Sequence, residues 1–300
     1  MSLLCVGSVA LDTLEGPFGR HEDVLGGAAS FFSTAASFFA PVSLVAVVGA
    51  DFPEAHVEFL AGRGIDTRGL ARAAGRTFRW GGRYSDDLAR RETIFTELGV
   101  FEVFDPTLPD GYRDAPFVFL ANIDPDLQRR VLEQARAPRF VAADTMNFWI
   151  GGKREALLKT LARVDLLVIN DEEARQLAED SSLLVAATRI RAMGPRSVVI
   201  KRGDAGAVLY AGEEIFAVPG YPLENAVDPT GAGDAFAGGL MGTVARAGSA
   251  DAETLRRAVV YGSVMGSLAV EGLGLDRLIR LRASEIEERF ARFRELVRFA

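Results

Sequence analysis

The sequence contains very little cysteine and histidine, and it has no run of basic residues. With Cys5 as its one cysteine among 300 residues, the chain cannot form an internal disulfide, which fits a reducing compartment. Its two histidines cannot build the Cys/His cluster of a structural zinc site. The formal net charge of −7 argues against nucleic acid or an anionic membrane as the main partner. We therefore expect a cytoplasmic protein with no nucleic acid and no membrane among its partners.

The chain also lacks a segment with the composition of a membrane span. Its most apolar stretch, residues 31–48, contains Ser, Thr and a central Pro41, which favours a helix, a turn and a buried strand. Met1-Ser2-Leu3 leads directly into a strand-like segment rather than into a signal peptide. Apolar residues make up 49% of the chain, which is enough to bury one large core.

Short apolar runs alternate with helical patterns along most of the chain. Fully buried parallel strands are predicted at residues 3–6, 42–48, 117–120, 140–143, 166–169 and 198–200. Helices are predicted at residues 28–39, 126–135, 153–162, 172–178 and 285–299, the last with a capping box formed by Ser284 and Glu287. The alternation predicts a doubly wound, mostly parallel α/β sheet with helices on both faces, in a single domain over residues 1–300.

Two stretches break this rhythm and predict a small β-sheet lid. Residues 11–25 and 77–98 are rich in Thr, Tyr, Phe, Gly and Arg, with partial alternation and no helical period. Within the second stretch, residues 77–80 and 91–95 have the pattern of hairpin strands joined through Ser85-Asp86-Asp87. A lid with exposed apolar strands could pair with a second copy, so a homodimer through the lid is a further expectation.

The segment from Asp228 to Asp234, Asp-Pro-Thr-Gly-Ala-Gly-Asp, carries the strongest functional signal. Its glycines let backbone N–H groups approach a ligand, and the helix that follows adds partial positive charge at its start. These features predict a phosphate site formed by Gly231, Ala232 and Gly233. Asp234 would repel bound phosphates, a cost that makes sense if it takes a proton from an attacking hydroxyl. The alternative is a glycine-rich turn in which Asp234 only caps the helix.

This segment, followed by Ala235-Phe236 and Gly238-Gly239, resembles the C-terminal signature of the PfkB, or ribokinase-like, carbohydrate kinases. Further motifs occur in the order and approximate spacing that the family shows, namely Gly7 with Asp12, Gly26-Gly27, Val48-Gly49-x-Asp51, Asn170-x-x-Glu173 and Lys201-x-Gly203-x-x-Gly206. The resemblance covers nearly the whole chain. It implies a ribokinase-like fold, a β-sheet lid that closes over the sugar, and the use of ATP with Mg²⁺.

The resemblance also implies that Asp12, Gly26 and Gly27 bind the acceptor. Asp12 follows the first strand, at the edge where ligands bind in open α/β sheets, and a carboxylate there can accept two hydroxyl hydrogen bonds. The alternatives are a turn aspartate for Asp12 and a plain helix-entry turn for the glycine pair.

The nucleotide side is implied by other motifs. Lys201, Gly203 and Gly206 resemble the loop that contacts the ATP phosphate and ribose, although such glycines also suit a simple hairpin. Asn170 and Glu173 could hold the water shell of Mg²⁺, or form a helix capping box, or do both. Ser263 stands in the adenine region, where the family commonly has Asn.

The departures from the family pattern concern the acceptor and the phosphates. Ala10 and Phe31 stand where ribose and fructose-phosphate kinases tend to have Asn, and Phe31 and Trp80 would give the acceptor an apolar wall. Residues 144–147, Asp-Thr-Met-Asn, match the family's Asp-Pro-Asn only loosely and lack the arginine that follows it, for which Lys153 is a candidate substitute.

The sequence therefore predicts an ATP-dependent kinase that transfers the γ-phosphoryl group to a hydroxyl of a sugar or related polyol, with a nucleoside kinase as the alternative. Asp234 would act as base, and the N–H groups of the turn would receive the phosphoryl charge. A non-catalytic sensor of nucleotide and sugar is less favoured because Asp234 is retained. A nicotinamide dehydrogenase is rejected, since its motif needs glycine where Phe236 stands.

Overall fold

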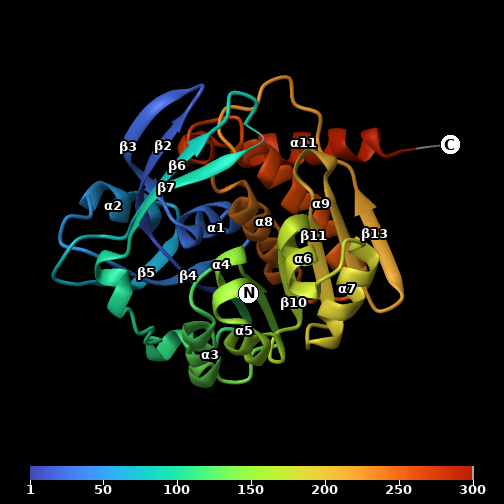
Figure 1. Ribbon diagram of the computed structural model, residues 1–300, viewed down its shortest axis with the longest axis horizontal. Helices are drawn as coiled ribbons and strands as arrows, with labels where there is room; N and C mark the ends of the chain where they lie inside the picture. Colours follow the sequence, from blue (N-terminus) through green and yellow to red (C-terminus); the bar gives the residue numbers. More distant parts are fainter. Residues whose placement is uncertain (89, 299–300) are drawn as a thin grey trace.

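Two β-sheets organise the chain, a large central sheet and a small one that stands apart from it (Figure 1). The structure is a computed structural model that describes residues 1–88 and 90–298. The strands of the nine-stranded central sheet lie side by side in the order β13 (Glu214–Val218), β12 (Ala207–Ala211), β11 (Ser197–Lys201), β10 (Leu166–Asn170), β9 (Phe140–Asp144), β8 (Phe117–Leu120), β1 (Leu3–Val6), β4 (Val42–Val48) and β5 (Ile65–Arg72). In this order, each strand from β11 across to β5 pairs in parallel with its neighbours, whereas β12 and β13 are antiparallel and form one edge of the sheet.

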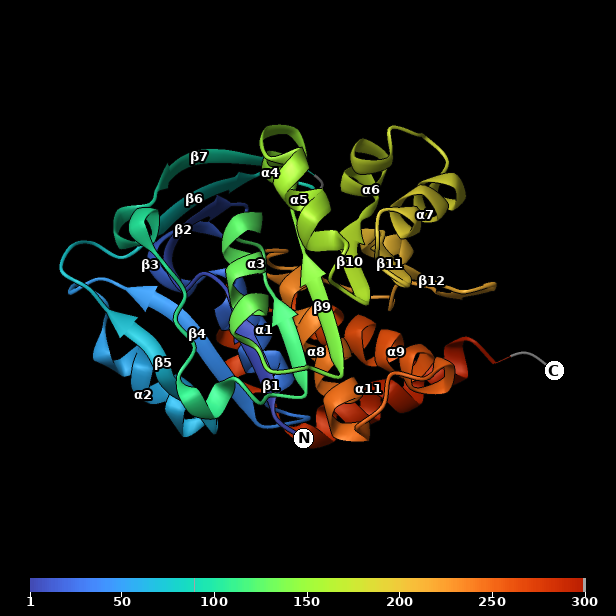
Figure 2. The same ribbon diagram turned by 90° about the horizontal axis from the view of Figure 1, so that it is seen from below.

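Helices cover both faces of this sheet, as the unbroken apolar runs predict. The hydrophobic core on one face takes in the helices α1 (Ala28–Ala36), α2 (Glu54–Gly62), α8 (Ala232–Ala247), α9 (Ala252–Ala269), α10 (Asp276–Arg280) and α11 (Ala283–Leu296). The core on the other face takes in α3 (Pro125–Gln134), α4 (Asn147–Gly152), α5 (Arg154–Leu161), α6 (Asp171–Ala178), α7 (Leu183–Ala192) and the 3₁₀ turns η1 (Gly99–Val103) and η2 (Asp110–Tyr112). Figure 2 shows the sheet between the α3–α5 layer and helices α1 and α8. The doubly wound prediction is confirmed.

The order of the strands reverses at β1, which defines where a ligand should bind. From β1 the chain proceeds to β4 and β5 on one side, and later to β8, β9 and β10 on the other. In an open α/β sheet such a switch point leaves a crevice at the carboxyl ends of the strands, and ligands bind there. The segments after β1, β9, β10 and β11 therefore meet at one edge of the sheet.

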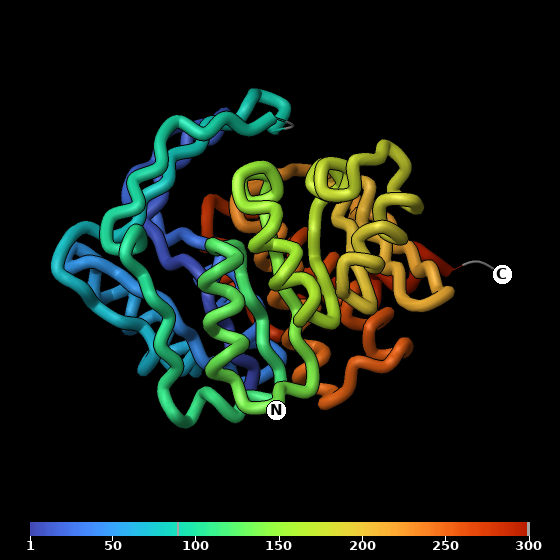
Figure 3. Tube along the Cα trace, turned by 60° about the horizontal axis from the view of Figure 1, so that its bottom comes forward, coloured from blue at the N-terminus to red at the C-terminus, as the bar shows by residue number. Residues whose placement is uncertain are grey.

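The second sheet is the predicted lid. Its strands lie in the order β3 (Gly19–Gly26), β2 (Ala10–Gly16), β6 (Arg79–Tyr84) and β7 (Arg91–Glu97). Figures 2 and 3 show it arching away from the central sheet, with β6 and β7 reaching toward α4. The predicted hairpin between residues 77 and 98 is present, although residue 89 lies outside the described residues. The dimer through the edge strands β3 and β7 stays a prediction.

One local prediction is wrong. The last helix begins at Ala283, so Ser284 and Glu287 do not form its capping box. The Glu285 carboxylate instead accepts a hydrogen bond from the Arg282 N–H (3.0 Å), while Glu287 accepts one from the Tyr261 hydroxyl (2.8 Å). Arg277 forms an ion pair with Glu285 (2.7 Å) and so favours Glu285 as the capping residue. Among residues 1–88 and 90–298, no helix combines the length and apolar character that crossing a bilayer would require.

Candidate active site

The segment from Asp228 to Asp234, which we call the anion turn, is fixed by buried hydrogen bonds. The Asp228 carboxylate has no exposed surface and accepts hydrogen bonds from the backbone N–H groups of Thr230 (2.9 Å) and Gly274 (2.8 Å). Gly231 has φ +72, a backbone conformation that favours glycine, and it caps helix α8. The Phe31 ring fills the space where a Cβ of residue 231 would lie. The turn is thus locked between the loop after α9 and helix α1.

The backbone of the turn offers donors to an anion. The Ala232 N–H donates to the Pro229 carbonyl oxygen (3.2 Å), so this predicted phosphate donor is engaged within the turn. The N–H groups of Gly231, Gly233 and Asp234 have no backbone acceptor in the described part of the chain. These unpaired donors lie at the start of a 16-residue helix, where the helix dipole adds partial positive charge. The turn therefore has the properties of an oxyanion or phosphate cradle.

Lys201 brings a positive charge to this cradle. It is the last residue of β11, and a Cβ at Gly233 would lie only 2.9 Å from its Nζ. The same ammonium forms an ion pair with Asp144, the last residue of β9, at 3.8 Å. Because β9 and β11 flank β10 in parallel, their carboxyl ends meet beside the turn. The sequence prediction placed Lys201 with the nucleotide, and the structure places it against the anion turn.

Three carboxylates surround the Lys201 ammonium and influence its pKa. Burial lowers the pKa of Lys201, but the charges of Asp144, Glu173 and Asp234 outweigh this effect and raise it overall. Burial raises the pKa of Asp234 to about 7, with a further increase from Asp144, while Lys201 and Arg91 oppose it. Burial and Asp144 likewise raise the pKa of Glu173 to about 7. Burial also raises the pKa of Asp144. A base at Asp234 is therefore poised close to neutral pH.

The predicted acceptor residues lie together beside the turn. Asp12, in β2, is only 5% exposed, and its carboxylate occupies the space where a Cβ of Gly26 would lie. Gly27 has φ +88, and its missing side chain would lie 2.5 Å from the Ser8 carbonyl oxygen. Burial raises the pKa of Asp12 to about 8, and a hydrogen bond from the Gly27 backbone lowers it, whereas Asp234 and Asp228 raise it. The glycine pair thus lets the carboxylate lie directly against the backbone.

A pair of side chains connects the lid to the anion turn. The hydroxyls of Tyr84, at the end of β6, and Thr230 are 2.8 Å apart and buried. Trp80, earlier in β6, is the direct partner of Asp12 in the parallel β2–β6 pairing. Its ring covers Gly82, whose absent Cβ leaves the space for it. An indole ring and a carboxylate therefore lie next to each other on the lid.

The remaining predicted nucleotide and metal residues occupy the adjoining strand ends. Asn170 and Glu173 form the capping box of α6, with the Asn170 Oδ1 accepting from the Glu173 N–H at 2.8 Å and the Glu173 Oε2 accepting from the Asn170 N–H at 3.0 Å. Gly203 begins the turn η3 (Gly203–Ala205) and faces open space. A Cβ at position 206 would clash with the backbone at the end of β13, so the fold itself requires glycine at this position. The Ser263 hydroxyl, on α9, is buried and has no hydrogen-bond partner among the described residues.

Comparison with known proteins decides the family. The model of the pfkB family carbohydrate kinases matches residues 15–279. The chain belongs to the pfkB family. A cytidine kinase from Thermococcus kodakarensis is 32% identical over 253 residues, which are 82% of this chain and 89% of that protein. A nucleoside kinase from Methanothermobacter thermautotrophicus is 29% identical over 259 residues, covering 85% of this chain and 81% of its own.

The fold is shared with solved structures of the same kind. A structure from E. coli described as a ribokinase II, in complex with ATP and Mg²⁺, has a TM-score of 0.80 at 22% identity, covering 97% of this chain and 99% of its own. The predicted family, fold and enzyme class are confirmed. This protein is an ATP-dependent kinase, a phosphotransferase with an alcohol group as acceptor.

Sequence reasoning gave no role to three residues that the structure places beside this candidate site. Tyr84 and Thr230 connect the lid to the turn, and Arg91, the first residue of β7, acts electrostatically on Asp234 and Glu173. Alternation in residues 79–84 would have placed Tyr84 on the same face as Trp80, which is the signal that could have found it. The candidate Lys153 forms ion pairs with Asp124 (2.6 Å) and Asp126 (3.5 Å).

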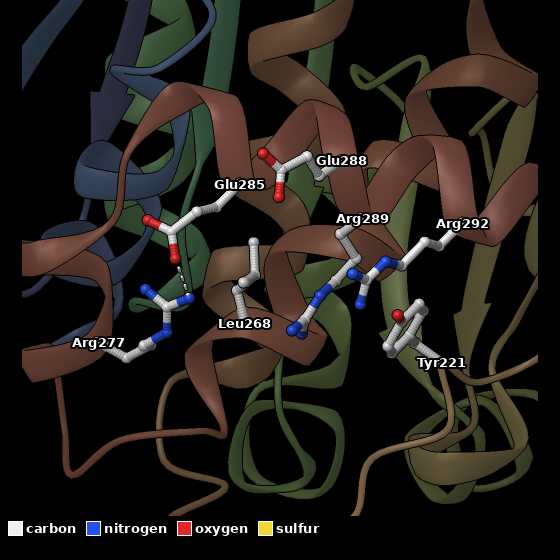
Figure 4. Close-up of a pocket in the computed structure, with 7 residues that line it drawn as sticks. All are labelled: Tyr221, Leu268, Arg277, Glu285, Glu288, Arg289 and Arg292. Atoms are coloured by element: carbon white, nitrogen blue, oxygen red, sulfur yellow. Dashed lines mark hydrogen bonds and ion pairs between the residues drawn. The ribbon is translucent and has the colours of Figure 1, made fainter.

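A surface pocket elsewhere on the kinase has a structural explanation. Figure 4 shows it between α9, α10 and α11, lined by Tyr221, Leu268, Arg277, Glu285, Glu288, Arg289 and Arg292. Arg277 pairs with Glu285 (2.7 Å), and Arg289 pairs with Glu271 (2.6 Å) and lies over the Tyr221 ring (4.7 Å). These contacts hold α10 and α11 against α9, and none of the lining residues belongs to the anion turn.

Proposed function

We propose that this pfkB-family kinase transfers the γ-phosphoryl group of ATP to a hydroxyl of a nucleoside. One observation carries the choice of acceptor: the buried Asp12 carboxylate and the Trp80 indole are direct partners on the lid. A carboxylate binds the hydroxyls of a ribose, and a neighbouring flat ring suits a nucleobase, since aromatic rings stack well on one another. The similarity to a cytidine kinase and a nucleoside kinase supports the same choice over a sugar or polyol.

In this proposal Asp234 is the general base. Its carboxylate takes the proton of the acceptor hydroxyl as the hydroxyl oxygen attacks the γ-phosphorus and ADP leaves. The N–H groups of Gly231, Gly233 and Asp234, together with the Lys201 ammonium, receive the charge on the phosphoryl oxygens. Asp12 and the Gly26-Gly27 loop hold the acceptor in line. Phe31 is almost fully buried beneath Gly231, so its predicted contact with the acceptor stays a prediction.

The site fits a magnesium ion that keeps most of its water. Among residues 1–88 and 90–298, no three His, Cys, Asp or Glu side chains are grouped so as to hold a metal ion. Mg²⁺ commonly binds through waters, one or two carboxylates and substrate phosphates, and Glu173, whose pKa is raised by burial and by Asp144, is the carboxylate that would face its water shell. When bound, the ion neutralises phosphate charge. Asn170, Gly203, Gly206 and Ser263 remain proposed nucleotide contacts.

ADP release from the intact chain tests the proposal. We would measure turnover with ATP and Mg²⁺ on a panel of cytidine, other nucleosides, ribose, fructose and inositol. The highest kcat/KM should belong to a nucleoside. A higher value for a free sugar or for inositol would instead support the sugar or polyol reading. Nucleotide binding without turnover on any acceptor would support the sensor.

A further inference from the structure

The active site has an excess of negative charge before ATP enters it. Asp144, Glu173 and Asp234 surround a single ammonium, that of Lys201, which the ion pair with Asp144 already engages. The triphosphate adds further negative charge, and Mg²⁺ would neutralise part of it, so a second protein cation beside Lys201 would favour both binding and transfer of the γ-phosphoryl group. Backbone N–H groups carry only partial charges. Besides Lys201, the Arg91 charge acts on two of these carboxylates, Asp234 and Glu173.

Arg91 lies on the inner face of the lid, the face formed by Asp12, Trp80, Gly82, Tyr84 and Arg91. It is the direct antiparallel partner of Tyr84, and paired residues of neighbouring strands project from the same face. The Tyr84 hydroxyl contacts Thr230 of the anion turn at 2.8 Å. The Arg91 guanidinium carbon lies 5.4 Å from the centre of the Trp80 ring. These contacts place Arg91, an exposed residue, on the side of the lid that meets the anion turn.

The two arginines of β6, Arg79 and Arg83, have carboxylate partners, whereas Arg91 of β7 has none among the described residues. Arg79 forms ion pairs with Asp23 and Asp51, and Arg83 pairs with Glu15 at 2.8 Å. Within residues 1–88 and 90–298, Arg91 forms no ion pair with a carboxylate, although it belongs to the same sheet. Stacking on the Trp80 ring leaves its N–H groups able to donate to a ligand. Its charge is therefore available to an anion bound in the turn.

We propose that Arg91 is a catalytic residue carried by the lid, whose guanidinium donates hydrogen bonds to the γ-phosphoryl oxygens of ATP. This inference rests on the proposed kinase reaction. In that reaction the acceptor oxygen forms a bond to the γ-phosphorus, the bond to the β–γ bridging oxygen breaks, and the hydroxyl proton moves to Asp234. Negative charge collects on the transferred group and on the leaving ADP, and a guanidinium stabilises it through paired N–H···O bonds. Closing the lid would then complete the site.

Kinetics of matched lid variants test this role. Arg91→Gln should lower kcat by on the order of 10² or more, since removing one preorganised charged donor has effects of this size. Arg91→Lys should retain part of the activity, because it keeps the charge but loses the bidentate geometry. Arg83→Gln is the control: it removes the same charge from the neighbouring strand, and its exposed pair with Glu15 should change kcat by less than about threefold.

A pH profile distinguishes this role from a structural one. The Arg91 charge lowers the pKa of Asp234, so removing it raises that pKa, and the acidic limb of kcat/KM should move to higher pH in Arg91→Gln. In Arg83→Gln it should stay in place. Loss of activity with an unshifted limb would leave Arg91 with a structural role only.

Nucleotide binding without an acceptor keeps the inference separate from the choice of substrate. By calorimetry, ATP should bind Arg91→Gln roughly tenfold more weakly than the unmodified protein, while ADP, which has no γ-phosphoryl group, should bind equally well. If no nucleoside is phosphorylated but this difference is found, the acceptor proposal fails and the Arg91 contact stands. If nucleosides are phosphorylated and Arg91→Gln behaves like Arg83→Gln in turnover and ATP binding, the Arg91 contact is overturned.

Discussion

A hydrogen bond between Tyr84 and Thr230 joins the inner face of the lid to the anion turn, but different forces hold the two parts in place. The turn is fixed by the fully buried Asp228, whose carboxylate binds the backbone at both Thr230 and Gly274. The strands of the lid are joined by backbone pairing, and the side chains that connect them include exposed ion pairs such as Arg83 with Glu15. Exposed pairs of this kind contribute only about 0–1 kcal/mol each. We therefore expect the turn to be the rigid half of the site and the lid to be the movable half.

The two parts of the site also have different proposed roles, phosphoryl transfer in the core and acceptor recognition on the lid. The groups proposed to transfer the phosphoryl group, Asp234, Lys201 and the N–H donors, sit on strand ends and a helix of the central core. The groups proposed to recognise the acceptor, Asp12 and Trp80, sit on the lid. Changes in the turn should therefore act on kcat, and changes on the lid should act mainly on KM. Arg91 is the proposed exception, because it brings a catalytic charge from the movable half.

The largest effect is expected at Asp234, in the rigid half. Asp234→Asn should lower kcat by on the order of 10² to 10⁴, the usual contribution of a general base, with little change in ATP affinity. In the unmodified protein, the pKa of about 7 means that kcat/KM should fall as the pH is lowered through about 7, because the base becomes protonated. Steady-state kinetics between pH 5 and pH 9 measure both effects. Near-normal turnover in the variant would show that Asp234 is not the base. The retention of Asp234 would then no longer argue against a non-catalytic sensor.

Substitution of Asp12 should change acceptor binding and protein stability in opposite directions. Its folded-state pKa of about 8 lies above its ordinary value of 3.8, so between these values the folded state binds a proton that the unfolded state releases. Stability is then lost as the pH rises through this range. Asp12→Asn should raise Tm at pH 8 by a few degrees and leave it nearly unchanged at pH 4. At pH 9, where Asp12 is ionised, the variant should also raise the acceptor KM by about tenfold, because a charged hydrogen-bond acceptor is lost. A lower Tm at pH 8 would contradict this account.

Most of the fold and much of the site could be predicted because their signals are local. The anion turn is a continuous segment, Lys201 ends a buried strand of the central sheet, and Asp12 lies a few residues after the buried strand β1, so each could be placed near the same edge of the sheet. Tyr84, Thr230 and Arg91 could not be assigned in this way. Their meeting depends on how far the lid curves over the core and on the pairing of Tyr84 with Arg91 across a hairpin with a register shift. The capping box of the last helix failed for a similar reason, since the distant Arg277 decides which glutamate caps it.

A smaller effect is expected where the two halves meet. Tyr84→Phe removes the hydroxyl that contacts Thr230 but keeps the ring, so the closed lid should lose one hydrogen bond, a loss of roughly 0.5–1.5 kcal/mol. The acceptor KM should rise a few-fold while kcat changes little. Thr230→Val should have the same effect, and the double variant should be no worse than either single one. Tyr210→Phe, a buried tyrosine of β12, is the control and should leave the kinetics unchanged.

The effect at Trp80 should be of similar size and the most informative about the acceptor. If the indole stacks on a nucleobase, Trp80→Ala should raise KM several-fold for a nucleoside, since an aromatic pair contributes roughly 0.5–1.5 kcal/mol beyond the area it buries. The KM for free ribose, which has no base, should stay the same in this variant. Gly82→Ala offers an independent version of the experiment, because its methyl group would enter the space of the Trp80 ring and displace it without removing it. Equal changes in KM for ribose and for nucleosides in both variants would show that Trp80 supports the structure of the lid and does not contact the nucleobase. The proposed role of Trp80 in acceptor recognition would then be wrong.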